Sequence, residues 1–213
     1  MLTTARIAVL RTIRPTIALC GSRNIPRGLT VKMEVATDVA GNPISPDTNS
    51  DGSVRHLKYK NGVMGFNYGA IPRTWEDPEV SYHGYAGDND PLDVVELSDG
   101  ALPLGAVVPA RVLGVLGLVD EGELDYKVIT LRASEAARRG WSDIDDVPAE
   151  VQADIIDWYR NYKTAEGKPV NELLWDGTIR DAAAALDIVR HTADAYAGLR
   201  ADPERATRLG LAL

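Results

Sequence analysis

Residues 105–131 read GAVVPARVLGVLGLVDEGELDYKVITL, two runs rich in valine and leucine on either side of a short polar segment. Runs of this kind predict buried strands, and the polar segment Asp120–Glu123 between them predicts the turn of a β-hairpin. Gly114 and Gly117 interrupt the first run, which indicates bends or the close approach of another backbone, as at the corner of a barrel. We therefore expect a β-hairpin here, with bends or close backbone contacts at its glycines.

Strand and turn patterns also fill the chain before this hairpin, whereas the chain after it is helical. Over residues 28–131, short apolar runs alternate with turn clusters rich in glycine, proline and asparagine. Apolar side chains then recur at helical spacing over residues 151–162. A last helix is expected to begin near Thr178, with Asp181 as its capping partner, and to run over residues 182–199. Strands first and helices later predict an α+β domain, a small twisted barrel flanked by C-terminal helices.

Composition excludes several classes of protein. The chain has 213 residues, a length that suits one domain, and a net charge of −8, which disfavours general binding of nucleic acid. No stretch approaches the roughly 18–20 uncharged apolar residues needed for a membrane span. Cys20 is the only cysteine, and the histidines at positions 56, 83 and 191 lack the spacing of metal ligands. Any metal must therefore be held by oxygen atoms.

The N-terminal segment differs in composition from the rest of the chain. Residues 1–27 contain five arginines and several threonines and serines, and the first acidic side chain is Glu34. This pattern is typical of an organellar transit peptide, and the alternative is an N-terminal arm that packs on the domain or on a partner. We expect the folded domain to span residues 28–213. A transit peptide would direct the protein to a mitochondrion or plastid, whereas the domain itself also suits the cytoplasm.

The segment Gly87–Asp93 (GDNDPLD) places three carboxylates, those of Asp88, Asp90 and Asp93, within six residues. Crowding of like charges is costly unless cations neutralise them, and Mg²⁺ prefers oxygen ligands. The segment therefore predicts a metal site. One alternative is a solvated acidic turn. Another is a calcium-binding loop, but the segment lacks the glycine and the closing glutamate of an EF-hand.

A second acidic segment, DEGELDYK, occupies residues 120–127. If Asp125 begins a strand, the two-residue period places Asp125 and Lys127 on the same face. The pair would then offer a metal ligand beside an ammonium group that binds anions, which suits a phosphate substrate bridged by a metal. The alternative is again an acidic turn in contact with solvent.

Taken in order along the chain, these segments resemble the motifs of the family I soluble inorganic pyrophosphatases. Gly87–Val94 (GDNDPLDV) is similar to the family signature. The other similar segments are Asn67–Ala70 (NYGA), Thr74–Pro78 (TWEDP), Val112–Leu116 (VLGVL), Asp120–Lys127, and Tyr162-Lys163 with Gly167–Pro169 (GKP). The resemblance covers roughly residues 24–200. Thr74–Pro78 and the run over residues 105–119 are similar to the eukaryote-type subfamily.

The resemblance implies a five-stranded β-barrel of OB-like shape and the Mg²⁺-dependent hydrolysis of inorganic pyrophosphate to two phosphates. Asp88, Asp93 and Asp125 match the family's core metal ligands, and Asp120 matches a ligand of the metal that arrives with the substrate. Asp93 would bridge two ions, which would lower the pKa of a water held between them. Asp90 matches the carboxylate that accepts a proton from this water or orients it.

The resemblance also implies a set of groups that bind the substrate. These are Lys32, Glu34, Arg55, Lys127, Tyr162 and Lys163. Tyr68 matches a catalytic phenol near the nucleophile. Without the resemblance, the residues have plainer interpretations: Tyr162 as a core aromatic residue, Lys32 and Arg55 as solvated charges, and Glu34 as a cross-strand partner of a lysine.

Two positions depart from the family pattern. Asn24 stands where the family usually has a glutamate that faces the metal cluster, and Met64 stands where some members have a tyrosine. Asparagine accepts a hydrogen bond from a metal-bound water but adds no negative charge. We therefore expect an active enzyme that needs more Mg²⁺, in which Asn24→Glu raises activity at low Mg²⁺.

The main alternative is a subunit with the pyrophosphatase fold that serves a larger assembly and has weak or no turnover. The basic segment and Asn24 favour it, whereas the full set of acidic and basic site residues argues against it. By resemblance to eukaryote-type relatives, we expect a homodimer whose small-molecule partner is pyrophosphate.

Overall fold

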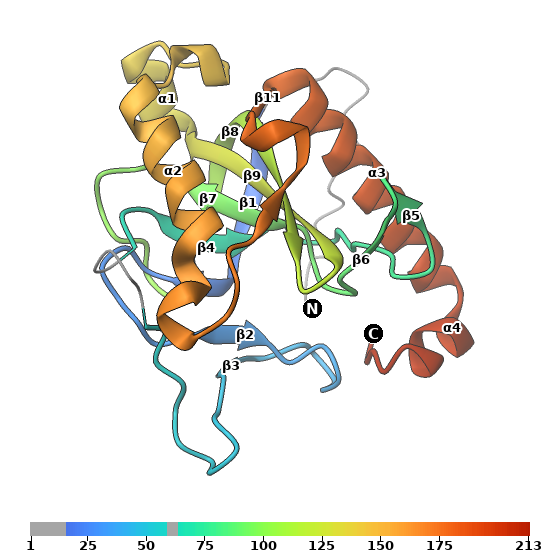
Figure 1. Cartoon of the computed structure of the whole chain (residues 1–213). Coiled ribbons are helices and arrows are strands. Elements are labelled where there is room, and N and C mark those ends of the chain that lie inside the picture. Colours follow the sequence, from blue (N-terminus) through green and yellow to red (C-terminus); the bar gives the residue numbers. More distant parts are fainter. Residues whose placement is uncertain (1–15, 59–63) are drawn as a thin grey trace, which may run out of the picture.

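A computed structural model of the chain describes residues 16–58 and 64–213, with the backbone alone for residues 16–24 (Figure 1). Its centre is the predicted hairpin, in which β8 (Val107–Asp120) pairs antiparallel with β9 (Glu123–Arg132). Glu121 and Gly122 of the turn both have positive φ, 53° and 95°, as in the type I′ turns that match the twist of the flanking strands. The prediction of a long hairpin is confirmed.

Gly114 provides the expected close approach of another backbone, whereas Gly117 makes room for a side chain. A Cβ atom at Gly114 would lie 2.5 Å from the carbonyl oxygen of Arg180, and one at Gly117 would lie 2.9 Å from the side chain of Leu174. These contacts lie where β10 (Glu172–Leu173) and β11 (Arg180–Asp181) pair with β8. The missing side chains therefore let the C-terminal part of the chain pack directly on the hairpin.

Five of the described strands pair in a cycle. β8 pairs with β1 (Thr16–Ile25), β1 with β4 (Asn67–Ala70), and β4 with β7 (Asp93–Glu96), all antiparallel. β7 then pairs in parallel with β9, which is itself the partner of β8. The result is a strongly twisted sheet in which β7 and β9, two strands far apart in sequence, are neighbours.

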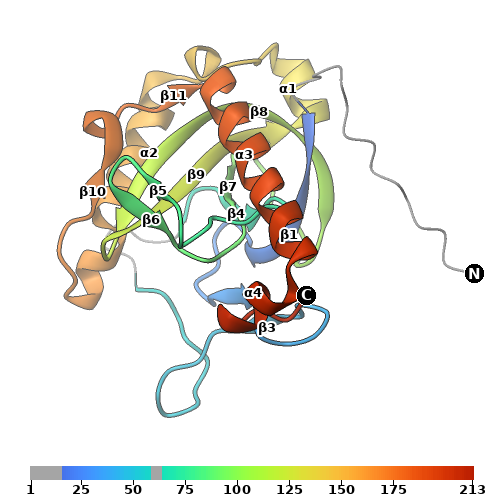
Figure 2. The ribbon, with the colours of Figure 1, turned by 90° about the vertical axis from the view of Figure 1, so that its right-hand side faces the viewer.

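The remaining described strands extend this sheet or stand apart from it. β6 (Tyr85–Gly87) joins β9 in parallel and forms a small hairpin with β5 (Ser81–Tyr82). β2 (Met33–Val35) and β3 (Ile44–Pro46) form a separate antiparallel pair. Figure 2 shows this pair below the main sheet, near the C-terminus.

All the described helices come after β9 in sequence, as expected for an α+β domain. They are α1 (Ala133–Arg139), η1 (Ile144–Asp146), α2 (Ala149–Asn161), η2 (Tyr162–Glu166), η3 (Leu174–Gly177), α3 (Ala182–Ala201) and α4 (Pro203–Arg208).

The predicted start of the last helix near Thr178 is wrong, because α3 begins at Ala182. Residues 180–181 are held extended by pairing with β8, and Asp181 is itself the N-cap of α3, where its side chain accepts a hydrogen bond from the backbone N–H of Ala184.

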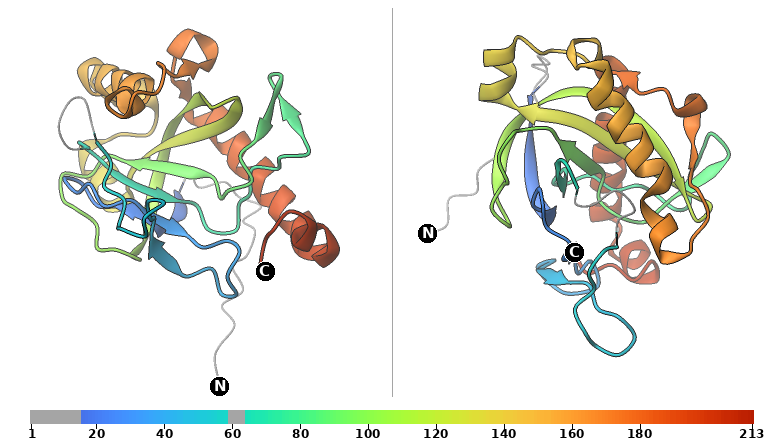
Figure 3. Two further views of the ribbon diagram at one scale, coloured as in Figure 1. Left: turned by 60° about the horizontal axis from the view of Figure 1, so that its bottom comes forward. Right: turned by 60° about the vertical axis from the view of Figure 1, so that its left-hand side comes forward.

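Helices α2 and α3 cover different faces of the sheet, as the two views in Figure 3 show. Ile155, Trp158 and Tyr159 of α2 pack with the side of β9 that carries Ile129 and Leu131. Ala185 and Ile188 of α3 pack with the opposite side, which carries Tyr126 and Val128. The two-residue period therefore places Asp125 and Lys127 on the α2 side of β9.

The α+β prediction is confirmed. Residues 1–15 of the predicted basic arm lie outside the described residues, whereas residues 16–25 form β1. The division between arm and domain, and the role of the arm as a transit peptide, stay predictions. None of the helices in the described part of the chain is long and apolar enough to cross a membrane.

Candidate active site

One cavity of about 190 Å³ gathers every site residue predicted from the sequence. Its walls include Lys32, Glu34, Arg55, Tyr68, Asp88, Asp90, Asp93, Asp120, Asp125, Lys127, Tyr162 and Lys163. The strands β2, β4, β7, β8 and β9, the helix η2 and three loops bring these side chains together. The fold thus places acidic and basic groups from distant parts of the sequence around a single space.

The floor of this cavity is a buried cation between two buried carboxylates. Asp93 on β7 and Lys127 on β9 are direct partners in the register of the parallel pair. The Lys127 ammonium donates hydrogen bonds to Asp93 Oδ2 at 2.6 Å and to Asp125 Oδ2, and only 2% of its side chain is exposed. Burial opposes the charge on Lys127, but Asp125 and Asp93 outweigh it and raise its pKa well above the ordinary value. Lys127 therefore stays positively charged at the base of the site.

Tyr68 connects β4 to this floor. Its hydroxyl donates a hydrogen bond to Asp93 Oδ2 and lies 3.4 Å from Lys127 Nζ. The ammonium of Lys127 also lies over the Tyr68 ring, 5.4 Å from its centre. The phenol is therefore held against the same oxygen atom that binds the buried lysine.

Asp88 and Asp90 project from a tight loop after β6. The backbone N–H of Asp90 donates to Asp88 Oδ1 at 3.0 Å, and Asn89 between them has a positive φ of 67°. A neighbouring segment holds the loop, because Glu76 donates its N–H to Asp90 O at 2.9 Å and accepts one from Asn89 at 3.0 Å. This contact needs a glycine at position 87, where a Cβ atom would lie 2.6 Å from the backbone of Glu76.

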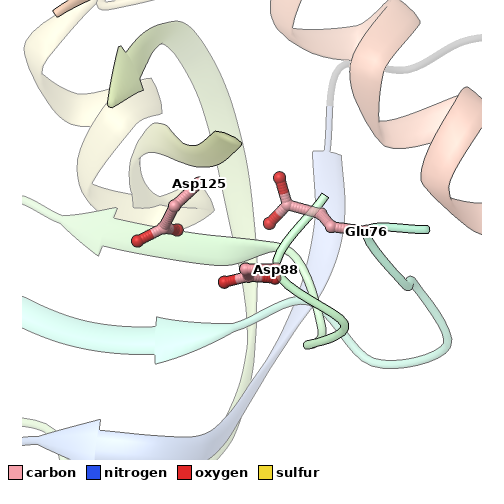
Figure 4. A group of neighbouring side chains, drawn as sticks. All are labelled: Glu76, Asp88 and Asp125. Atoms are coloured by element: carbon pink, nitrogen blue, oxygen red, sulfur yellow. The ribbon is translucent and has the colours of Figure 1, made fainter. Parts of the chain in front are cut away.

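The same neighbouring segment contributes a carboxylate that the sequence reasoning missed. Glu76 is only 4% exposed, and one oxygen from each of Glu76, Asp88 and Asp125 lies within 4.8 Å of the others (Figure 4). Burial, with the charges of Asp88 and Asp125, raises the pKa of Glu76 well above its ordinary value. In the sequence, the only signal for Glu76 is its place in the Thr74–Pro78 motif. Its approach to the acidic loop depends on the fold, so the sequence pattern could not predict it.

This acidic group fits a hard divalent cation. Oε1 of Glu76 accepts a hydrogen bond from the backbone N–H of Tyr126 at 3.1 Å, whereas the buried Oε2 accepts none from any described residue. A buried carboxylate oxygen without a hydrogen-bond donor is costly, and a cation shared with neighbouring carboxylates removes that cost. The donor set consists entirely of oxygen, as expected from the scarcity of cysteine and histidine in the sequence.

Asp120, Tyr162 and Lys163 form a second group in the same cavity. Asp120 at the end of β8 accepts hydrogen bonds from the Tyr162 hydroxyl at 3.0 Å and from Lys163 Nζ at 2.5 and 2.6 Å. Burial raises the pKa of Tyr162 well above its ordinary value, and Asp120 and Asp125 add to this against the opposing charge of Lys127. Tyr162 is therefore a neutral hydroxyl donor at ordinary pH.

The rim carries the basic groups from the first part of the chain. Lys32 forms an ion pair with Glu34 and lies 3.4 Å from Asp47, whose carboxylate also accepts a hydrogen bond from Arg55 at 3.0 Å. Arg55 reaches across to Glu166 of η2 at 3.1 Å. Asp47 and Glu166 were not foreseen from the sequence.

Comparison with known proteins identifies the family. The family model described as inorganic pyrophosphatase matches residues 23–197. This chain belongs to the inorganic pyrophosphatase family.

Individual members of the pyrophosphatase family agree with this assignment. Human inorganic pyrophosphatase is 38% identical over 183 residues, which are 82% of this chain and 63% of that protein. Mouse inorganic pyrophosphatase 2, described as mitochondrial, is 38% identical over 78% of this chain and 52% of its own length. The chain therefore spans less than two thirds of these two relatives.

A solved pyrophosphatase structure is similar over more of its length. The vacuolar soluble pyrophosphatase of Trypanosoma cruzi, truncated at its N-terminal domain and in complex with PPi, superposes with a TM-score of 0.82. It is 33% identical, and the match covers 94% of this chain and 75% of that chain. The mixed α+β architecture predicted from the sequence is thus the architecture of solved pyrophosphatases.

The two departures from the pyrophosphatase pattern have different outcomes. Met64 is 3% exposed and lines the cavity, where it packs with the apolar residues on the α2 side of the sheet. Asn24 lies in β1, but its side chain is outside the described part of the structure. The expected effect of Asn24 on Mg²⁺ demand therefore stays a prediction.

Proposed function

We propose that this chain hydrolyses inorganic pyrophosphate to two phosphates with the help of Mg²⁺. The main observation behind this proposal is one cavity whose walls contain both carboxylates and the side chains of lysine and arginine. Family membership supports it, as does the T. cruzi relative, whose structure is described as a complex with PPi. Pyrophosphate is a small polyanion, and such a substrate is best held by cations from the protein and by divalent ions together.

Asp88, Asp93 and Asp125 would hold the cations at the floor of the site, and Asp120 would hold a further cation that arrives with the substrate. A divalent ion bound there would lower the pKa of a coordinated water and offset charge on the phosphates. Asp93 and Asp125 are suited to this role because they share the sheet floor and have their charge partly balanced by Lys127.

Asp90 would accept the proton from the attacking water or orient that water. Its backbone is fixed by hydrogen bonds to Asp88 and Glu76, so its carboxylate enters the cavity from a rigid loop. Tyr68 would hold Asp93 in place through its hydroxyl. Proton transfer to a positioned carboxylate typically contributes about 10²–10⁴-fold to a rate.

Lys127, Lys163 and Arg55 would bind the phosphate oxygens, with Lys32 and the Tyr162 hydroxyl beside them. Arg55 and Lys163 are already held by Glu166 and Asp120, so their charges face the cavity at little further cost in side-chain entropy. Glu34 would position Lys32 through their ion pair. Cations that are ordered before the reaction stabilise the charge that develops on the leaving phosphate.

Phosphate release from pyrophosphate across a Mg²⁺ titration tests this proposal, with Asp90→Asn as the control. We expect rapid release that requires Mg²⁺ and is lost in Asp90→Asn. If the wild type releases phosphate no faster than Asp90→Asn at every Mg²⁺ level, the proposal is contradicted. That result would support the structural-subunit alternative, to which the comparisons with known proteins lend no support.

We further propose that the cyclic strand pairing is the OB-like barrel expected from the family and that the protein is a homodimer. Sedimentation analysis tests the dimer. A mitochondrial location is also a proposal; it draws support from the basic residues 1–27 and from the mouse relative described as mitochondrial. Fusion of these residues to a fluorescent protein tests it, with diffuse cytoplasmic signal as the contrary result.

A further inference from the structure

We infer that Glu76 is a further carboxylate of the metal centre, whose Oε2 binds the cation held by Asp88 and Asp125. This inference rests on the proposed metal-dependent function and adds a residue to it. The resemblance to the family assigned no role to Glu76, and the structure alone brings it to the site.

Three carboxylate oxygens lie close enough together to share one ion. Mg²⁺ binds oxygen at about 2.0–2.1 Å, so two ligands on opposite sides of one ion are about 4.2 Å apart. Oxygens of Glu76, Asp88 and Asp125 all lie within 4.8 Å of one another, close to what a single ion requires (Figure 4).

The two carboxylate oxygens of Glu76 differ in their hydrogen bonding. Its side chain comes from a loop that packs against the start of β9, and Oε1 is fixed by the N–H of Tyr126, the residue after Asp125. Oε2 is buried and accepts no hydrogen bond from the described residues. A purely structural carboxylate would be expected to satisfy both oxygens, because burying an unsatisfied acceptor costs free energy.

Hydrogen bonds fix the backbone of Glu76 against the acidic loop. The backbone of Glu76 exchanges hydrogen bonds with Asn89 and Asp90, and the absent side chain of Gly87 permits this contact. The side chain of Trp75 also donates to Asn89 Oδ1 at 3.0 Å. Glu76 is therefore clamped to the Asp88 loop on one side and to β9 on the other, so it joins the two elements that supply the metal ligands.

The test compares binding of Mn²⁺ by the wild-type protein, Glu76→Gln and Glu123→Gln. Mn²⁺ takes the same oxygen ligands as Mg²⁺, and free Mn²⁺ is counted by electron paramagnetic resonance without substrate or turnover. Glu76→Gln keeps the acceptor for Tyr126 and removes the charge. Glu123→Gln is the matched control, because it removes an exposed carboxylate from the same strand as Asp125 outside the cavity.

We expect Glu76→Gln to bind Mn²⁺ roughly 10- to 100-fold more weakly than the wild type, and Glu123→Gln to bind it within about twofold. In EDTA, Glu76→Gln should melt no lower than the wild type, because the amide oxygen still accepts the hydrogen bond from the N–H of Tyr126 and the substitution adds no charge beside Asp88 and Asp125. Should it not fold, Glu76→Asp keeps the charge but withdraws it by one methylene, and weaker Mn²⁺ binding is expected there as well.

Equal Mn²⁺ affinity in Glu76→Gln and the wild type would overturn this inference, even if phosphate release from pyrophosphate is normal. Weaker Mn²⁺ binding in Glu76→Gln, together with a wild type that releases no phosphate, would support the metal role of Glu76 and refute the proposed function. A wild type that binds no Mn²⁺ would overturn both.

Discussion

The cavity has a buried floor and a solvated rim, and the two hold their charges by different means. The floor consists of Asp93, Asp125 and Lys127, whose side chains are 1%, 10% and 2% exposed. The rim consists of Lys32, Glu34 and Arg55, which are 29%, 36% and 31% exposed. In both regions carboxylates pair with cations. The register of two neighbouring strands positions the side chains of the floor, whereas ion pairs in contact with water position those of the rim.

The contribution of an ion pair to stability depends on whether the pair is buried or exposed. Removing one partner from a buried pair leaves an uncompensated charge and is strongly destabilising, whereas an exposed pair contributes little to stability. Variants in the floor should therefore change folding and function together. Variants in the rim should change function while leaving the free energy of unfolding almost intact.

The largest effect is expected for Lys127→Met. It leaves the buried carboxylates of Asp93 and Asp125 without their cation, so the free energy of unfolding in EDTA should fall by about 3–5 kcal/mol. Mg²⁺ should reduce this loss, because a bound cation restores positive charge beside the same carboxylates. Urea unfolding followed by tryptophan fluorescence, with EDTA and then with Mg²⁺, measures both quantities. If Lys127→Met and the wild type have the same free energy of unfolding in EDTA, the floor and the rim do not differ in how their ion pairs affect stability.

An intermediate effect is expected for Lys163→Met, since Lys163 and Asp120 are 19% and 18% exposed. Phosphate release should fall roughly 10²-fold, because a cation that stabilises developing charge is lost. The free energy of unfolding should change by about 1 kcal/mol or less. Lys168→Met is the matched control: Lys168 pairs with exposed Glu121 outside the cavity, so its loss should leave the rate unchanged. Equal losses of rate in both variants would argue for a nonspecific effect of charge.

A smaller effect is expected for Arg55→Met in the rim. Loss of a charge-assisted contact to phosphate should raise KM for pyrophosphate about tenfold, which corresponds to about 1.4 kcal/mol. The free energy of unfolding should stay within about 1 kcal/mol of wild type. Initial rates over a range of pyrophosphate concentrations give the KM, and urea unfolding gives the stability. A large drop in stability with unchanged KM would show that Arg55 belongs with the floor.

Much of the floor could be predicted from the sequence. The two-residue period of a strand placed Asp125 and Lys127 on one face, and the acidic motif pointed to Asp88, Asp90 and Asp93. The pairing of Asp93 with Lys127 could not be predicted, because β7 and β9 are parallel neighbours separated by β8 in sequence. Local patterns determine which face a residue occupies, but not which strand lies beside it.

The missed residues all depend on contacts between distant segments. Glu76 reaches the acidic loop only because Gly87 leaves room for its backbone, and Glu166 meets Arg55 across 111 positions of sequence. The predicted start of the last helix failed for the same kind of reason, since pairing with β8 keeps residues 180–181 extended. Helix propensity and capping patterns do not show which distant segments of the chain will be in contact.

The smallest effect concerns the pH dependence of the rim. Burial acts to raise the pKa of Asp47, but Arg55 and Lys32 outweigh it, so the pKa lies below its ordinary value in the folded protein. A depressed carboxyl pKa adds stability that is present above the unfolded pKa and is lost as pH falls through the folded one. The wild type should therefore exceed Asp47→Asn in stability by up to about 1 kcal/mol above roughly pH 4, and this difference should vanish at lower pH. Urea unfolding at several pH values between about 5 and 2.5 measures it. A difference that persists at the acidic end would mean that Asp47 supports the rim through packing rather than through its charge.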